Sequence, residues 1–148
     1  MITNYEEIPL IPDHEVAQFI QILKNSKFNF VEQQYSPESF GNYQIELCSS
    51  TTCCRLTRDR GIWSIEIKGT LSNRWHYLYN LRTLITGEQY ISDWPIDDQI
   101  QFLADHLSDI EKAFSPIVFI MTDVLLRREQ IRVAKKFYNR NTGSTGAD

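Results

Sequence analysis

The chain has 148 residues with 42% hydrophobic, 12% aromatic and 23% charged side chains, and its formal net charge is −4. These values are typical of one globular domain with a hydrophobic core, and they exclude an intrinsically disordered chain. The acidic balance disfavours nucleic acid as a partner, because a domain that binds nucleic acid is normally basic.

Two features bear on location. The first residues are acidic and lack the basic and apolar regions of a signal peptide. The apolar stretch at 117–126 is interrupted by Asp123 and is too short to cross a bilayer. We therefore expect a soluble cytoplasmic protein without a membrane partner, in which the three cysteines are reduced by default.

The first predicted element is a helix that Asp13 caps and that ends near Asn25. Its apolar stripe consists of Val16, Phe19, Ile20 and Leu23. Residues 28–35 then predict a strand, although their alternation weakens after Val31. The sequence leaves open which edge of the sheet this strand occupies.

Three alternating runs follow, at 43–48, 53–57 and 63–68, and they predict an antiparallel meander. Four-residue loops at 49–52 and 58–61 set Leu47 opposite Cys54, Ile45 and Trp63 opposite Leu56, and Ile65 opposite Cys54. Every large apolar residue then shares one face, which a one-residue slip would destroy. This inward face comprises Tyr43, Ile45, Leu47, Cys54, Leu56, Trp63, Ile65 and Ile67.

On the other face the same register sets Glu46 opposite Arg55 and Cys48 opposite Cys53. The two cysteines are near enough to oxidise, but two small half-buried thiols are the favoured interpretation. Cys54 points to the opposite face from Cys53, so the two are not expected to bind one zinc ion. The open face is a candidate contact surface and carries Glu46, Arg55, Ser64 and Glu66.

The second half of the chain is predicted to be helical. Ser72 or Asn73 caps a helix from Arg74 to Thr86 that Gly87 ends. Its buried side is expected to be Trp75, Leu78, Leu81 and Ile85. A helix over 96–114 buries Ile96, Ile100, Leu103, Leu107, Ile110 and Phe114, and Ser115-Pro116 introduces a last helix from about Ile117 to Tyr138.

These elements predict an α+β fold. An N-terminal helix precedes an antiparallel β-meander of three to four strands, which packs against about three C-terminal helices. Residues 1–140 form a single domain in this interpretation, and 141–148 form a disordered tail.

The helix over 96–114 also carries an acidic stripe opposite its apolar one. The stripe comprises Asp98, Gln101, Asp105 and Asp109, with no interleaved Lys or Arg. It is a candidate docking face for a basic protein, for which Trp94 in the preceding connection is a candidate anchor. The favoured interpretation is an ordinary solvated helix face.

The end of the last helix is basic, with Arg127, Arg128, Arg132, Lys135, Lys136 and Arg140. Such a cluster can contact phosphate or anionic lipid. The favoured alternative is that these side chains face water and complement the helix dipole.

The sequence contains no motif for a cofactor, a metal or a catalytic nucleophile. His14, His76 and His106 lack the spacing of a metal site, and no glycine-rich phosphate loop is present. If a small-molecule site exists between the sheet and the helices, Arg55, Arg74 and His76 are its candidate residues.

The run from Cys54 to Ile67 consists of a strand, an Arg/Asp/Gly turn and a strand that opens with Trp63, and Trp94-Pro95 precedes a later helix. In this pattern the chain resembles small bacterial immunity proteins of polymorphic toxin systems. The resemblance covers about half the chain and carries over no functional residue. It implies a cytosolic, non-enzymatic protein that binds and blocks a toxin, and the acidic stripe suits a basic nuclease.

Three functions follow in order of preference. The first is a protein-binding module, most concretely an immunity-like inhibitor. The second is a small-molecule-binding domain or an enzyme, and the third is a homo-oligomeric structural subunit. The identity of any partner or ligand does not follow from the sequence.

Overall fold

The computed structural model describes residues 9–89 and 93–141, with side chains as far as Tyr138. In chain order the elements are α1 (His14–Asn25), β1 (Asn29–Ser36), β2 (Asn42–Cys48), β3 (Thr52–Asp59), β4 (Ile62–Gly69), β5 (His76–Tyr77), α2 (Leu78–Thr86), α3 (Ile96–Ala113) and α4 (Phe119–Asn141). This order confirms the predicted α+β fold. Among the described residues, no helix is both long and apolar enough to span a membrane.

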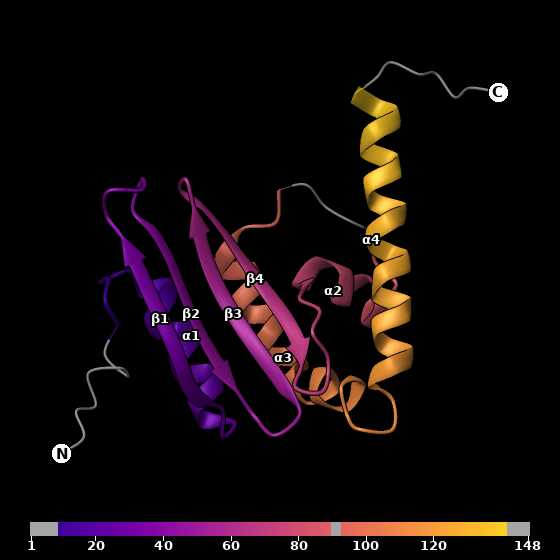
Figure 1. Cartoon of the computed structure of the whole chain (residues 1–148), viewed down its shortest axis with the longest axis horizontal. Coiled ribbons are helices and arrows are strands. Elements are labelled where there is room, and N and C mark those ends of the chain that lie inside the picture. Colours follow the sequence, from indigo (N-terminus) through magenta and orange to yellow (C-terminus); the bar gives the residue numbers. More distant parts are fainter. Residues whose placement is uncertain (1–8, 90–92, 142–148) are drawn as a thin grey trace.

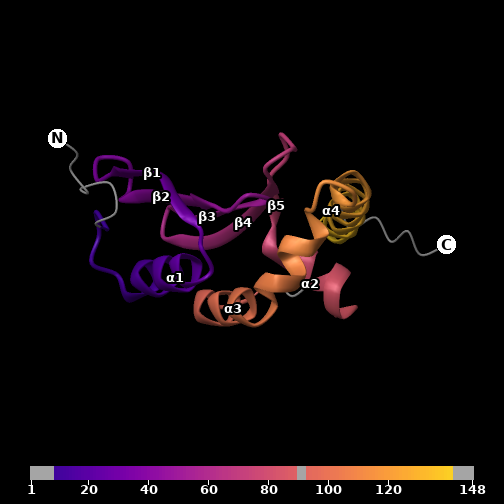
Figure 2. The ribbon, with the colours of Figure 1, turned by 90° about the horizontal axis from the view of Figure 1, so that it is seen from below.

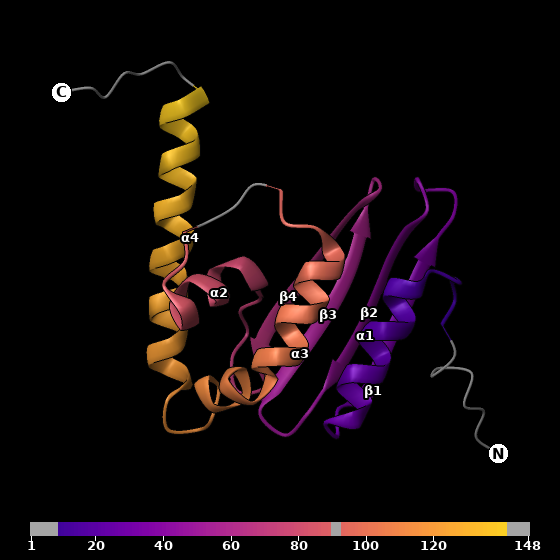
Figure 3. The ribbon, with the colours of Figure 1, turned by 180° about the vertical axis from the view of Figure 1, so that it is seen from behind.

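The five strands form one antiparallel meander in the order β1-β2-β3-β4-β5 (Figure 1). Helices α1 and α3 lie side by side against one face of the sheet, as the view from below shows (Figure 2). Helices α2 and α4 stand beyond the β4–β5 side, and α4 packs on α2 (Figure 3). The strand over 28–35, whose place was open, is the edge strand beside β2.

The predicted register of β2 and β3 is confirmed. Leu47 lies opposite Cys54, Glu46 opposite Arg55, and Cys48 opposite Cys53. Period-2 alternation determines which residues of this hairpin face the core, because any odd shift would move the apolar residues into solvent, and the four-residue loop then sets the register.

The predicted register of β3 and β4 is wrong by two residues. Leu56 lies opposite Ile65 rather than Trp63, and Cys54 lies opposite Ile67. The connection is a two-residue turn at Arg60 and Gly61, whose φ angles of 53° and 81° suit the twist of a tight hairpin. An even shift keeps each side chain on its face, so the prediction of the inward face survives the error.

The core lies between the inward face of the sheet and helices α1 and α3. Its sheet residues include Ile45, Leu47, Leu56, Ile65 and Ile67, which are all buried. The helices contribute Val16, Phe19, Leu23, Ile100, Leu103, Leu107, Ile110 and Phe114. Of the predicted inward residues, Trp63 alone is half-buried; it packs against the core near the end of the sheet, and Arg58 lies over its ring.

Helix α1 has the predicted extent, but its cap works differently. Asp13 occupies the N-cap position and makes no side-chain hydrogen bond to the helix. Its carboxylate instead accepts a hydrogen bond of 3.1 Å from Arg58, whose guanidinium also donates to the carbonyl of Gly41. The side chain of Asp13 thus ties α1 to the end of β3.

The predicted helix start at Arg74 is wrong. Residues His76 and Tyr77 form β5, and α2 begins only at Leu78. Pairing with Glu66 and Ile67 of β4 overrides local helix propensity here. Trp75 therefore lies outside the core and stacks on Arg55 of the open sheet face, with the guanidinium carbon 4.1 Å from the ring centroid. The predicted stop at Gly87 is confirmed by its φ of 76°.

The last two helices agree with prediction except at their ends. Helix α3 buries the predicted stripe, although Ile96 at its start is half-buried. Helix α4 begins at Phe119 rather than Ile117, after a turn over 114–118. It extends to Asn141, so the predicted tail loses its first residue to the helix, and 142–148 lie outside the described residues.

Candidate partner-binding groove

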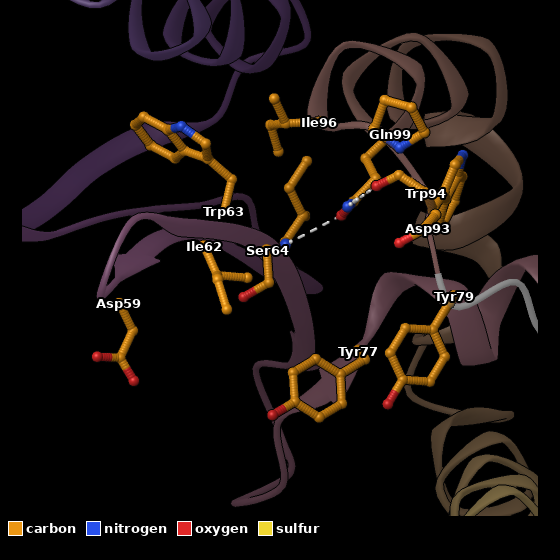
Figure 4. Close-up of a pocket in the computed structure, with 12 residues that line it drawn as sticks. Asp59, Ile62, Trp63, Ser64, Tyr77, Tyr79, Asp93, Trp94, Ile96 and Gln99 are labelled. Carbon is orange, nitrogen blue, oxygen red and sulfur yellow. Dashed lines mark hydrogen bonds between the residues drawn. The ribbon is translucent and has the colours of Figure 1, made fainter.

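The candidate site follows from the short length of β5. This strand pairs only with Glu66 and Ile67, so no described strand covers residues 62–65 on that side of β4. A groove of about 670 Å³ runs along this free edge (Figure 4). Its lining comprises Asp59, Ile62, Trp63, Ser64, Ile65, Tyr77, Tyr79, Asp93, Trp94, Pro95, Ile96 and Gln99.

Gln99 fixes one end of the groove. Its side chain is buried, and its carboxamide oxygen accepts a hydrogen bond of 3.3 Å from the backbone N–H of Ile65. Its amide nitrogen donates to the carbonyl of Trp94 over 2.9 Å (Figure 4). One helix side chain therefore satisfies the edge of β4 and positions the segment before α3.

Aromatic side chains form much of the wall. Tyr77 and Tyr79 stack in parallel with their ring centroids 5.1 Å apart. Trp94 packs edge-on against Phe102 of α3 at 5.5 Å, and Arg82 lies over its ring at 5.2 Å. These contacts hold the aromatic surfaces in place before any partner binds, which reduces the entropy that binding must offset.

The ionised residues known to line the groove are acidic. Among the described residues, Asp59 and Asp93 line it and no Lys, Arg or His does so, but three arginines lie against the lining: Arg60 4.0 Å from Asp59, and Arg58 and Arg82 over the rings of Trp63 and Trp94. Both aspartates are exposed, and the side chain of Asp59 is 74% exposed. Figure 4 shows them at opposite ends of the groove, with the aromatic wall between them. The groove therefore suits an extended ligand with cationic groups. Carboxylates at opposite ends are not placed to act together on one bond, as a catalytic pair of carboxylates does.

The predicted acidic stripe lies on the outward face of α3. Asp98, Gln101, Asp105 and Asp109 are all exposed. Gln101 donates to Asp105 over 2.9 Å, and Asp109 lies 3.7 Å from His106. The stripe begins at Asp98, two residues after the groove-lining Ile96, but Asp98 and Gln101 line a separate hollow with Gln18, Gln21 and Ile22 of α1. The basic residues of α4 with described side chains also face water.

The alternative ligand residues are not brought together. Arg55 lies on the open face of the sheet and donates to Glu66 over 2.9 Å. His76 is buried on the helix side, 3.0 Å from Asp123 of α4, whereas Arg74 is exposed. Because the sheet separates Arg55 from His76, these residues do not line one pocket.

The favoured interpretation of Cys48 and Cys53 as free thiols is wrong in this structure, in which they form a disulfide across β2 and β3. Their directly opposed positions, with Cα atoms 4.0 Å apart, allow the bond. Within the described residues, these sulfurs and a carboxylate oxygen of Glu46 lie within 4.8 Å of one another. A metal would require the reduced thiolates. Cys54 is free, and burial raises the pKa of its thiol.

Sequence reasoning found part of this site. It named Trp94 as an exposed anchor, and Trp94 lines the groove. It missed Asp59, Tyr77, Asp93 and Gln99, which come from three distant segments. The signal that could have found them is Asp93-Trp94-Pro95, which places an acidic and an aromatic residue in a connection. Nothing in the sequence shows that β4 is longer than β5, the strand that pairs with it.

Comparison with known proteins finds no match among protein-family models, curated proteins or solved structures. Functional inference therefore depends on the geometry and charge of the chain itself.

Proposed function

We propose that this chain is a protein-binding module whose partner presents a basic, extended segment to the groove beside β4. The observation that carries the proposal is the groove itself, with aromatic walls, carboxylates at both ends and no cation among its described lining residues. Complementary charge directs a basic partner to such a surface, and preformed aromatic walls supply the contact area.

A binding role accounts for this lining better than catalysis does. Among the described lining residues there is no cysteine, histidine or lysine. Ser64 is among them, and its side-chain hydrogen-bond partner is the hydroxyl of Thr57 at 2.8 Å, not a histidine or lysine base. The most concrete form of the proposal is a cytoplasmic immunity-like inhibitor that binds a basic toxin. The acidic stripe on α3 would extend the contact beyond the groove.

Affinity capture from the native cell, followed by titration calorimetry with the purified partner, tests this function. We expect Asp59→Lys with Asp93→Lys to weaken binding at least about tenfold, since each substitution replaces an attraction with a repulsion. Asp98→Lys, Asp105→Lys and Asp109→Lys together should weaken it less and mainly slow association. The control is Glu38→Lys in the exposed β1–β2 loop, which reverses one charge at a position far along the chain from Asp93 and should leave binding unchanged. Unchanged affinity in the Asp59/Asp93 double variant would contradict the groove as the partner site.

A second candidate, a homo-oligomeric subunit, is favoured by the outward side of α4. Four residues of α4 form this outward stripe, Ile120, Met121, Val124 and Ile131, with exposures of 66%, 60%, 51% and 46%, and Ile117 in the preceding turn is 97% exposed. Met121, Val124 and Ile131 keep the spacing of a coiled-coil seam, in which Arg128 occupies the intervening position. Apolar residues gathered in this way on one surface are typical of an association site.

Light scattering across a concentration series separates the two candidates. If the stripe associates, wild type forms a dimer or larger species, and Ile120→Glu with Val124→Glu returns it to a monomer. A wild type that stays monomeric at high concentration excludes this candidate and leaves the groove unaffected.

A further inference from the structure

The backbone of β4 shows which groups face the groove. In an antiparallel strand, the N–H and C=O of alternate residues point to the same side. The N–H of Ile65 points away from β3, because it donates to Gln99. The backbone groups of Trp63 therefore face the groove, as does the carbonyl of Ile65, whereas those of Ile62 and Ser64 face β3.

The two-residue turn supports this assignment independently. Asp59 and Ile62 close the turn at Arg60 and Gly61, and the closing pair of such a hairpin is hydrogen-bonded. Ile62 thus bonds to β3, and by alternation Trp63 and Ile65 do not. An open row of backbone groups of this kind is the usual template for an added strand.

Gln99 occupies part of this template in a manner that resembles a strand. Its carboxamide is chemically a peptide group, with one acceptor and donors, and it takes the position of a neighbouring backbone beside Ile65. Its bond to Ile65 is long at 3.3 Å, and a peptide N–H···O bond is typically about 2.9–3.0 Å. A backbone carbonyl that arrives with a partner strand can therefore replace it.

We propose that an extended segment of a partner protein adds to β4 as a sixth strand, in line with β5, and displaces the carboxamide of Gln99 from Ile65. This inference rests on the proposed function and specifies its binding mode. The segment bonds to Trp63 and Ile65, and it spans roughly four residues, or about 13 Å, of strand edge. Lys or Arg side chains at its ends meet Asp59 and Asp93, and its apolar side chains contact Tyr77 and Trp94.

The charge of the groove selects this occupant over a second copy of the chain. No cation is among the lining residues that the structure describes, and two carboxylates flank the edge. The chain's own edge strand β1 carries Glu32 and no Lys or Arg, so β1 of another copy would bring a third carboxylate to the groove. A basic segment from a different protein suits the charge, whereas edge-to-edge pairing of two copies does not.

The test uses the full-length chain and a displayed library of random octapeptides. We expect enrichment of peptides that alternate apolar residues with Lys or Arg, and Asp59→Asn with Asp93→Asn should weaken their binding roughly threefold to tenfold. The enriched peptide is then N-methylated at either of its two alternating sets of residues. Because only one set donates to β4, methylating that set should weaken binding about tenfold or more, and the other set should change it less than about twofold.

Amide exchange measured by NMR on the same complex reports on the protein side. Saturating peptide should slow exchange at Trp63 at least about tenfold, while Ile62 and Ser64, already bonded to β3, and Ile65, which exchanges the Gln99 acceptor for a backbone carbonyl, change less. Equal effects of the two methylation sets, or unchanged exchange at Trp63, would overturn strand addition. If binding still depends on Asp59 and Asp93 in that case, the groove remains a protein-binding site. Absence of any enrichment over the Asp59→Lys/Asp93→Lys variant would count against both proposals.

Discussion

The two free edges of the sheet, β1 and the unpaired part of β4, differ in how their unpaired backbone is protected. Unpaired backbone at an edge invites association with other chains. On β1 the ladder with β2 shifts register between Phe30 and Glu32, and such a bulge twists the edge out of line for pairing. On β4 the ladder with β3 is regular over its whole length. The β1 edge is therefore irregular and poorly suited to pairing, whereas the β4 edge is regular and lies inside the groove.

The difference between the edges supports β4, rather than β1, as the proposed binding edge. Edge β1 carries exposed Glu32 and Gln34. Glu32 also lies directly opposite Glu46, an arrangement that costs stability between like charges. On the free side of β4, Glu66 and Ile67 pair with β5, and the N–H of Ile65 donates to the side chain of Gln99. A regular edge that a single side chain protects is consistent with the proposed strand addition at β4.

The largest expected contrast between the edges concerns packing. Ile65→Ala in β4 removes a side chain that is only 1% exposed, so it should lower the free energy of unfolding by about 2–5 kcal/mol. Val31→Ala in β1 removes an exposed side chain and should change it by less than about 0.5 kcal/mol. Urea unfolding measures both values. Similar losses at the two sites would mean that β1 contributes to the core as much as β4 does.

A smaller effect is expected where Gln99 protects the edge. Gln99→Leu leaves the N–H of Ile65 and the carbonyl of Trp94 without their partner, and it should destabilise the fold by about 1–3 kcal/mol. Gln101→Leu two residues later is the matched control, because Gln101 is exposed and bonds only to Asp105 among the described contacts. Thermal unfolding that ranks the two variants equally would show that the Gln99 contacts carry no stability.

The smallest effect concerns pH at the β1 edge. Burial, together with repulsion from Glu32, raises the pKa of Glu46, and Lys68 and Arg55 oppose the shift. The folded state then holds this proton more tightly than the unfolded state. The stability contributed by this group is therefore present at acidic pH and falls as the pH rises from the ordinary value of 4.5 through the folded pKa.

Glu46→Gln removes this dependence. Relative to wild type, the variant should gain stability between about pH 4 and pH 7, and Glu32→Gln should reproduce part of that gain, about 0.2–1 kcal/mol. Unfolding at a series of pH values measures the difference, with Glu38→Gln as the control for loss of one carboxylate. If the difference in unfolding free energy between Glu46→Gln and wild type does not change with pH, the Glu46 carboxyl has the same pKa in the folded and unfolded states.

The sequence predicts what depends on periodicity. Alternation in β2, β3 and β4 identified the buried face, and spacings of three and four identified α3, because misplacing those residues would expose the core. The β3–β4 register was wrong by two because both registers bury the same side chains. Arg60-Gly61 also lacks the Asn-Gly or Asp-Gly signature of a two-residue turn.

The groove could not be predicted in the same way. It depends on β5 being only two residues long, which follows from the pairing of His76 and Tyr77 with β4 rather than from their own pattern. Gln99 lies on α3 one residue before Ile100 of the apolar stripe, and its bond to Ile65 spans 34 positions of the chain. Contacts of this range arise only when α3 packs on the sheet.

The central claim is that the free half of β4 is the edge that receives a partner. Residue-resolved amide exchange over both edges, with and without a saturating basic peptide enriched on the full-length chain, tests it most directly. The predicted result is new protection at Trp63 and none along β1. Protection along β1, or binding that leaves Trp63 unprotected, would contradict the account.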